Sequence, residues 1–77
     1  RLDQSGRPQD ALAAGEEAVS VYRVLAAARP DAHVPDLARA LYAHSRRLEG
    51  LRRWDEALAA VREAFHLLPE LALYERR

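Results

Sequence analysis

Residues 10–14 read Asp-Ala-Leu-Ala-Ala and residues 56–60 read Glu-Ala-Leu-Ala-Ala, so one short segment occurs almost unchanged at two places in the chain. A second match, Glu17-Ala18 with Glu63-Ala64, falls at the same offset of 46 residues (57 − 11 = 46). Two separate segments that recur in one register indicate an internal repeat, and such repeats are typical of folds that stack helical units. The sequence therefore predicts a helical array.

The composition favours helix independently of the repeat. The 77 residues are rich in alanine, leucine, arginine and glutamate, contain no isoleucine or threonine, and include only five valines. Strong helix formers therefore dominate over the β-branched residues that suit strands. The hydrophobic fraction of 49% and the charged fraction of 31% are typical of a folded core. We expect one small domain, or part of a larger one, without a deep enclosed pocket.

Apolar residues recur at three- and four-residue steps in three runs, and each run predicts a helix. The first helix is expected over about residues 8–28, ended by Pro30, with the stripe Ala11, Leu12, Ala18, Val19, Tyr22, Leu25 and Ala26. The second is expected to begin near Pro35 or Asp36 and to end at Gly50, with the stripe Leu37, Leu41, His44, Ser45, Leu48 and Leu51. The third is expected to end before Pro69, with the stripe Trp54, Ala57, Leu58, Val61, Ala64, Phe65 and Leu68. Short connections predict antiparallel neighbours.

The second and third runs resemble the tetratricopeptide repeat family, in a long-repeat bacterial form. The large and small positions of that family's first helix fall on Leu41, His44, Ser45 and Leu48, and those of its second helix and following proline on Ala57, Val61 and Pro69. Four features depart from the pattern: Ser45 replaces the usual glycine, His44 takes a large position, Gly15 stands where a bulky residue is usual, and the offset exceeds ~34 residues.

The resemblance implies an all-α fold, a right-handed α-solenoid of antiparallel helix pairs with about two repeats that are incomplete at both ends. Within a single unit of residues 1–77, residues 1–30 would be the second half of one repeat, with a long second helix. Residues 35–69 would be a complete repeat, and residues 70–77 the start of a following helix. Leu2 would belong to the last turn of a preceding helix.

Side-chain size predicts how these helices pack. Four small residues are expected where helices approach closely: Ala11, Ala18, Ala57 and Ala64. Four large residues are expected to fill the space between helices: Leu41, Leu48, Trp54 and Phe65. In particular, Trp54 is expected to be buried between the second and third helices.

Charge and residue types argue against several classes of function. Twelve basic residues, all arginine, balance twelve acidic ones along the whole chain, so no nucleic-acid-binding patch is expected. No cysteine is present, and no uncharged stretch is long enough to cross a membrane, so we expect no membrane partner and a cytoplasmic location.

The sequence offers no candidate residues for catalysis, a cofactor or a metal ion. His33, His44 and His66 lack the three- or four-residue spacing of ligands on one helix face, and no glycine-rich phosphate loop is present. His44 lies on the apolar stripe and is interpreted as a core histidine with one hydrogen-bonded nitrogen, whereas His33 and His66 are interpreted as surface or loop residues. We therefore expect no enzymatic activity.

One set of residues stands out as a candidate partner-binding site: Arg39, Tyr42 and Arg46, spaced at steps of three and four along the second helix. The family resemblance implies that this helix lines a concave inner surface, where these three side chains would contact a protein or peptide with acidic residues. The alternative is an ordinary solvated stripe with a half-buried tyrosine. The chain contains no asparagine, which argues against the family's clamp for carboxylate-terminated peptides.

The predicted function is thus a protein-interaction scaffold or a regulatory binding module. Two alternatives remain open from the sequence. The chain could be a self-association module that pairs through its exposed repeat ends, or a sensor segment of a larger enzyme or NTPase.

Overall fold

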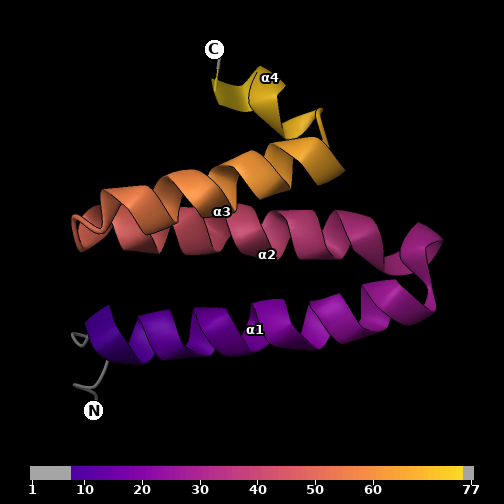
Figure 1. Cartoon of the computed structure of the whole chain (residues 1–77), viewed down its shortest axis with the longest axis horizontal. Coiled ribbons are helices and arrows are strands. Elements are labelled where there is room, and N and C mark those ends of the chain that lie inside the picture. Colours follow the sequence, from indigo (N-terminus) through magenta and orange to yellow (C-terminus); the bar gives the residue numbers. More distant parts are fainter. Residues whose placement is uncertain (1–7, 76–77) are drawn as a thin grey trace.

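The computed structural model describes residues 8–75, and within this range the chain is helical and contains no strand. The helices are α1 (Pro8–Ala28), α2 (Pro30–Gly50), α3 (Trp54–Leu67) and α4 (Leu71–Glu75) (Figure 1). The all-α prediction is confirmed, as are the expected bounds of the first and third helices. The expectation for Leu2 lies outside the described residues.

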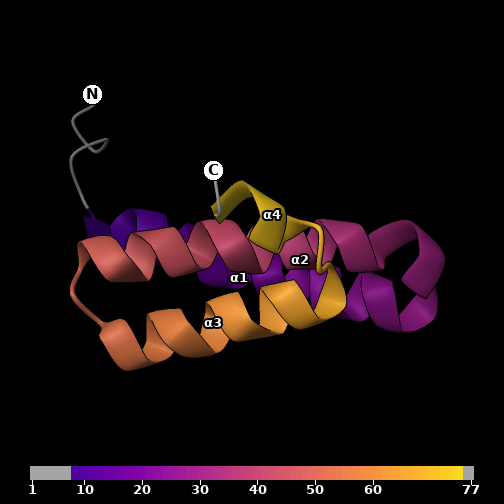
Figure 2. The same cartoon turned by 90° about the horizontal axis from the view of Figure 1, so that it is seen from above.

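The helices pack in the order in which they follow one another along the chain. α2 packs extensively on both α1 and α3, whereas α4 makes far fewer contacts, mainly with α3. Figures 1 and 2 show α1 and α3 on different sides of α2, with α4 near the carboxyl end of α3. Since α1–α2 and α2–α3 are joined by one and three residues, each pair is antiparallel as expected.

The junction between α1 and α2 differs from the prediction, because α2 begins at Pro30 and carries Pro35 inside it. Arg29 alone makes the turn: its N–H donates to Leu25 O at 2.8 Å, and its carbonyl accepts from Ala32 and His33. Pro30 occupies the first helical position, where a missing N–H costs nothing because that group would have no partner in the helix. Pro30 therefore starts a helix as well as ending one.

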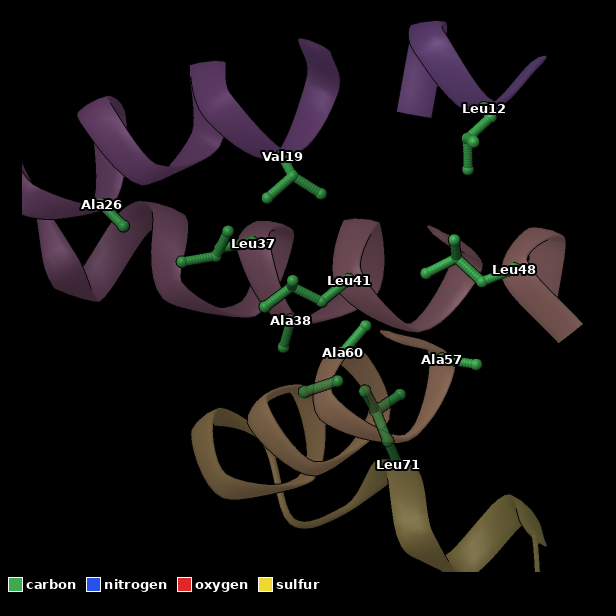
Figure 3. Packing of buried hydrophobic residues seen from close by; sticks show 11 residues of the cluster. Leu12, Val19, Ala26, Leu37, Ala38, Leu41, Leu48, Ala57, Ala60 and Leu71 are labelled. Atoms are coloured by element: carbon green, nitrogen blue, oxygen red, sulfur yellow. The ribbon is translucent and has the colours of Figure 1, made fainter. Parts of the chain in front are cut away.

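The core is formed by small and medium apolar side chains on the facing sides of the helices (Figure 3). Its members are Leu12, Val19, Ala26, Leu37, Ala38, Leu41, Leu48, Ala57, Ala60, Ala64 and Leu71. Ala38 on α2 and Ala64 on α3 are fully buried, which allows the two backbones to approach closely. Buried Ser45 satisfies its hydroxyl by donating to Tyr42 O at 2.6 Å.

The prediction of small residues at helix contacts is correct for α3 and only partly correct for α1. Ala57 and Ala64 are buried, whereas Ala11 is exposed and Ala18 is half-buried. On α1 a tight contact with α2 falls instead at Gly15, where an added Cβ would lie 2.9 Å from His44 Nδ1 and 3.4 Å from Arg47 Nη1. A larger residue at position 15 would have to displace the imidazole.

The prediction that Trp54 is buried is wrong, because its exposed fraction is 60%. The buried residues of α3 are the three alanines Ala57, Ala60 and Ala64. Trp54 and Leu58 lie beside that side of the helix, and no other described helix covers them. Of the other predicted space-filling residues, Leu41 and Leu48 are buried and Phe65 is partly buried.

The turn after α2 places an arginine in the left-handed region. Arg52 has φ 62°, and the N–H groups of Arg52 and Arg53 donate to Glu49 O and Leu48 O, both at 2.9 Å. This pattern is the Schellman motif, in which glycine is the usual residue because a Cβ is strained at positive φ. We expect Arg52→Gly to raise the free energy of unfolding by about 1 kcal/mol, measured by urea denaturation. An unchanged or lower free energy of unfolding would contradict backbone strain at Arg52.

Candidate partner-binding surface

The three predicted site residues lie together on the exposed side of α2. Arg39 and Arg46 are exposed, and Tyr42 between them is half-buried. The side chains of Leu37, Leu41 and Leu48 occupy the opposite, buried side of the same helix. The steps of three and four residues therefore do place the predicted stripe on one side of a helix.

Contacts from two helices hold the ring of Tyr42 in place. Its centroid is 6.0 Å from that of Phe65 on α3, with an interplanar angle of 33°. The guanidinium carbon of Arg46 lies 5.9 Å from the Tyr42 ring centroid, and Arg46 Nη1 donates to the Tyr42 hydroxyl at 3.3 Å. Arg46 Nε is also 3.7 Å from Glu49 Oε1. The tyrosine is thus positioned before any partner arrives, which lowers the entropy that binding would cost.

Arg39 is more loosely held and lies next to apolar surface. Its guanidinium is 3.7 Å from Asp36 Oδ1, a long contact between exposed groups. Arg39 also borders a hollow of about 370 Å³ between α2 and α4, whose other lining residues are Pro35, Leu68, Glu70 and Leu71. No sequence pattern indicates this hollow, since its walls come from separate helices and meet only in the folded chain.

A second hollow, of about 390 Å³, lies on a different side of α2, between α1 and α3. Arg23 on α1 and Glu63 on α3 bridge it with two hydrogen bonds, from Nη1 to Oε2 at 2.6 Å and from Nη2 to Oε1 at 2.8 Å. The hydrogen bonds from Arg23 lower the pKa of Glu63 below its usual value of 4.5. No spacing rule could have predicted this pair, because its members are 40 residues apart.

The Arg23–Glu63 bridge gives a pH-dependent contribution to stability. A lowered carboxyl pKa stabilises the fold above the pKa of the unfolded chain, and that contribution is lost as the pH falls through the lower, folded-state pKa. We expect Glu63→Gln to reduce the free energy of unfolding at pH 7 by at most about 1 kcal/mol, because both side chains are substantially exposed. The wild-type and Glu63→Gln chains should become equally stable well below pH 4.5. Denaturation of both chains at pH 7 and at the acidic pH measures this. A difference that persists in acid would contradict the bridge.

The histidines differ in part from their predicted environments. His44 is half-buried on the packed side of α2, but its Nδ1 is buried without a hydrogen-bond partner among the described residues, so the expected bond is absent at that nitrogen. His33 lies inside α2 rather than in a loop, half-buried, with Nδ1 3.5 Å from Asp36 Oδ2. His66 is exposed, as predicted.

Within residues 8–75, no three acidic, histidine or cysteine side chains gather as metal ligands, and no helix is long and apolar enough to span a membrane. Comparisons of the chain with protein-family models, with curated proteins and with solved structures gave no match. Function is therefore argued from the geometry of the surface around Tyr42.

Proposed function

We propose that this chain is a protein-interaction module whose α2 presents Arg39, Tyr42 and Arg46 to an acidic segment of a partner protein. The observation that carries the proposal is the fixed ring of Tyr42, held between Phe65 and Arg46 at an exposed surface. Tyrosine and arginine are enriched among the few interface residues that contribute most of the binding energy. The guanidinium groups are suited to bidentate hydrogen bonding with carboxylates.

The proposal extends to the architecture of the chain. In it, α2 and α3 form one helix pair of a right-handed α-solenoid of the tetratricopeptide type, α1 is the second helix of the preceding pair, and α4 begins the following one. The antiparallel contacts between consecutive helices support this arrangement. The Tyr42 surface would then belong to the inner side of the array, where the hollow between α2 and α4 could take an apolar side chain of the partner.

Exposed ion pairs contribute only ~0.2–1 kcal/mol each, so the two arginines alone would bind weakly. Most of the affinity would come from Tyr42 and the apolar walls beside Arg39, with the arginines selecting acidic sequences. Binding should therefore be modest, and it should weaken as the salt concentration rises.

The test uses a panel of synthetic peptides that combine glutamate with leucine, together with lysine-for-glutamate versions of the same peptides. We expect the acidic set to bind the full chain, and Arg39→Glu with Arg46→Glu to weaken that binding about tenfold, measured by fluorescence anisotropy. The matched control is the double change Arg29→Glu with Arg52→Glu, two exposed arginines outside this surface. Circular dichroism confirms that each variant is helical.

Equal affinity of the Arg39/Arg46 variant and the wild-type chain for the acidic peptides, in low and in high salt, would show that this surface is only solvated. Equal loss in the control variant would show that net charge, rather than these positions, controls binding.

A further inference from the structure

The three arginines of α2 differ in whether a carboxylate of this chain already lies beside them. Asp36 Oδ1 is 3.7 Å from Arg39 Nη1, and Glu49 Oε1 is 3.7 Å from Arg46 Nε. Arg47 is exposed and makes no ion pair with another described residue. Its guanidinium is therefore the one that a carboxylate of another molecule can reach without replacing a partner.

Arg46 is also engaged by an aromatic ring. Its guanidinium carbon is 5.9 Å from the ring centroid of Tyr42, and its Nη1 donates to the hydroxyl of the same residue. A carboxylate that bound Arg46 would compete with these contacts and with Glu49. In the surface proposed above, Arg46 therefore acts mainly by holding Tyr42 in place.

Arg39 and Arg47 both border one hollow of about 370 Å³ between α1 and α2. They are eight residues apart (47 − 39 = 8), and Ala43 lies one turn from each of them. The remaining walls are mostly small or apolar, with Gly15, Ala18 and Tyr22 on α1 and Asp36, Ala40 and Ala43 on α2. The two arginines thus lie on the same side of α2, with a small residue between them.

The walls of this hollow carry more positive than negative charge. Asp36 is the only acidic residue among its described lining residues, and it already lies close to Arg39 and His33. Asp10 and Glu17 are exposed on α1 but do not line the hollow. The excess positive charge is therefore that of Arg47.

Arg47 is also held close to α1 by packing. Its Nη1 would lie 3.4 Å from a Cβ added at Gly15, so the guanidinium reaches the backbone of α1 only because position 15 has no side chain. A cationic group that packing positions without a counter-charge favours binding of an anionic group from outside.

We propose that Arg47 is a further carboxylate-binding residue, and that Arg39 and Arg47 together bind two acidic side chains of one extended partner segment. This assignment rests on the proposed function and specifies its contacts. Eight residues of helix span about 12 Å. In an extended chain, side chains four residues apart point to the same side and are separated by roughly 13 Å. A small or apolar residue midway between the two acids would lie over Ala43.

The first test measures binding by fluorescence anisotropy, with a peptide that carries two glutamates four residues apart and a leucine midway between them. We expect Arg47→Gln to weaken binding about threefold and to reduce its salt dependence. A peptide with the glutamates eight residues apart, the spacing that a helical segment would need, should bind less tightly.

Arg62→Gln is the matched control for Arg47→Gln. Arg62 is exposed on α3, makes no ion pair with another described residue and borders none of the hollows described above. Both changes remove one positive charge, so a difference between them reports position rather than net charge. Circular dichroism checks that each variant is helical.

Exchanging charges shows which arginine meets which glutamate. Two further peptides each carry lysine in place of one of the two glutamates. Arg47→Glu should bind one of these peptides more tightly than the parent peptide, and Arg39→Glu should do so with the other. Arg46→Glu should prefer neither lysine peptide over the other, because Arg46 contacts Tyr42 and does not border the hollow.

Equal affinities of the Arg47→Gln and Arg62→Gln chains for the acidic peptide, with weaker binding by Arg39→Gln, would overturn the role of Arg47 and leave the proposed function standing. A preference of Arg39→Glu and Arg47→Glu for the same lysine peptide would overturn the pairing, and tighter binding of the eight-residue spacing would overturn the extended conformation. Absence of binding by the wild-type chain would overturn the proposed function and this assignment together.

Discussion

Replacing Leu41 by alanine is expected to lower the free energy of unfolding by about 2–5 kcal/mol, whereas replacing Trp54 by alanine is expected to lower it by less than about 1 kcal/mol. Leu41 is only 3% exposed and lies on α2, the helix that packs on both α1 and α3. Its removal leaves a cavity that cannot collapse without moving a helix. Trp54 is larger, but most of its surface already contacts solvent.

The loss expected for Leu41→Ala is a large part of the total free energy of unfolding. A chain of this length has a total stability on the order of 4–12 kcal/mol, so Leu41→Ala should leave a marginal fold. Urea denaturation followed by circular dichroism measures both variants, at a concentration low enough to keep the chains monomeric. A larger loss for Trp54→Ala than for Leu41→Ala would show that Trp54 is buried after all.

Enlarging Ala64 to leucine is expected to destabilise the chain by about 1–3 kcal/mol. Ala64 is fully buried on the side of α3 that packs on α2, where Ala38 is fully buried as well. A leucine there must push the two helices apart or adopt a strained rotamer, because the interior is already close-packed. The measurement is the shift of the urea midpoint.

Ala59→Leu is the matched control for Ala64→Leu. Ala59 lies on the same helix but is exposed, and both changes replace alanine by leucine, so helix propensity changes equally in the two variants. The difference in stability between them therefore isolates packing. Equal effects of the two changes would contradict the close approach of α2 and α3.

Local sequence was sufficient for the helices themselves. Composition and periodicity predicted an all-helical chain, the bounds of α1 and α3, and the placement of Arg39, Tyr42 and Arg46 on one side of α2. These features depend on propensity and on the 3.6-residue turn, which act over neighbouring residues. Proline was the exception: Pro30 was expected only to end the first helix, whereas the hydrogen bonds that Ala32 and His33 donate to Arg29 O show that it also begins α2.

Tertiary structure alone decided which predicted stripes are covered. Periodicity places Trp54 and Ala57 on adjoining parts of α3, but it cannot tell that α2 packs over Ala57 and leaves Trp54 exposed. The contact of Gly15 with His44 and the bridge from Arg23 to Glu63 likewise join residues from different helices. A helical pattern fixes which side chains share a side of a helix, because that depends on the backbone's own geometry. Whether that side is buried depends on the distance and angle to a neighbouring helix, which the contacting side chains of both helices determine together.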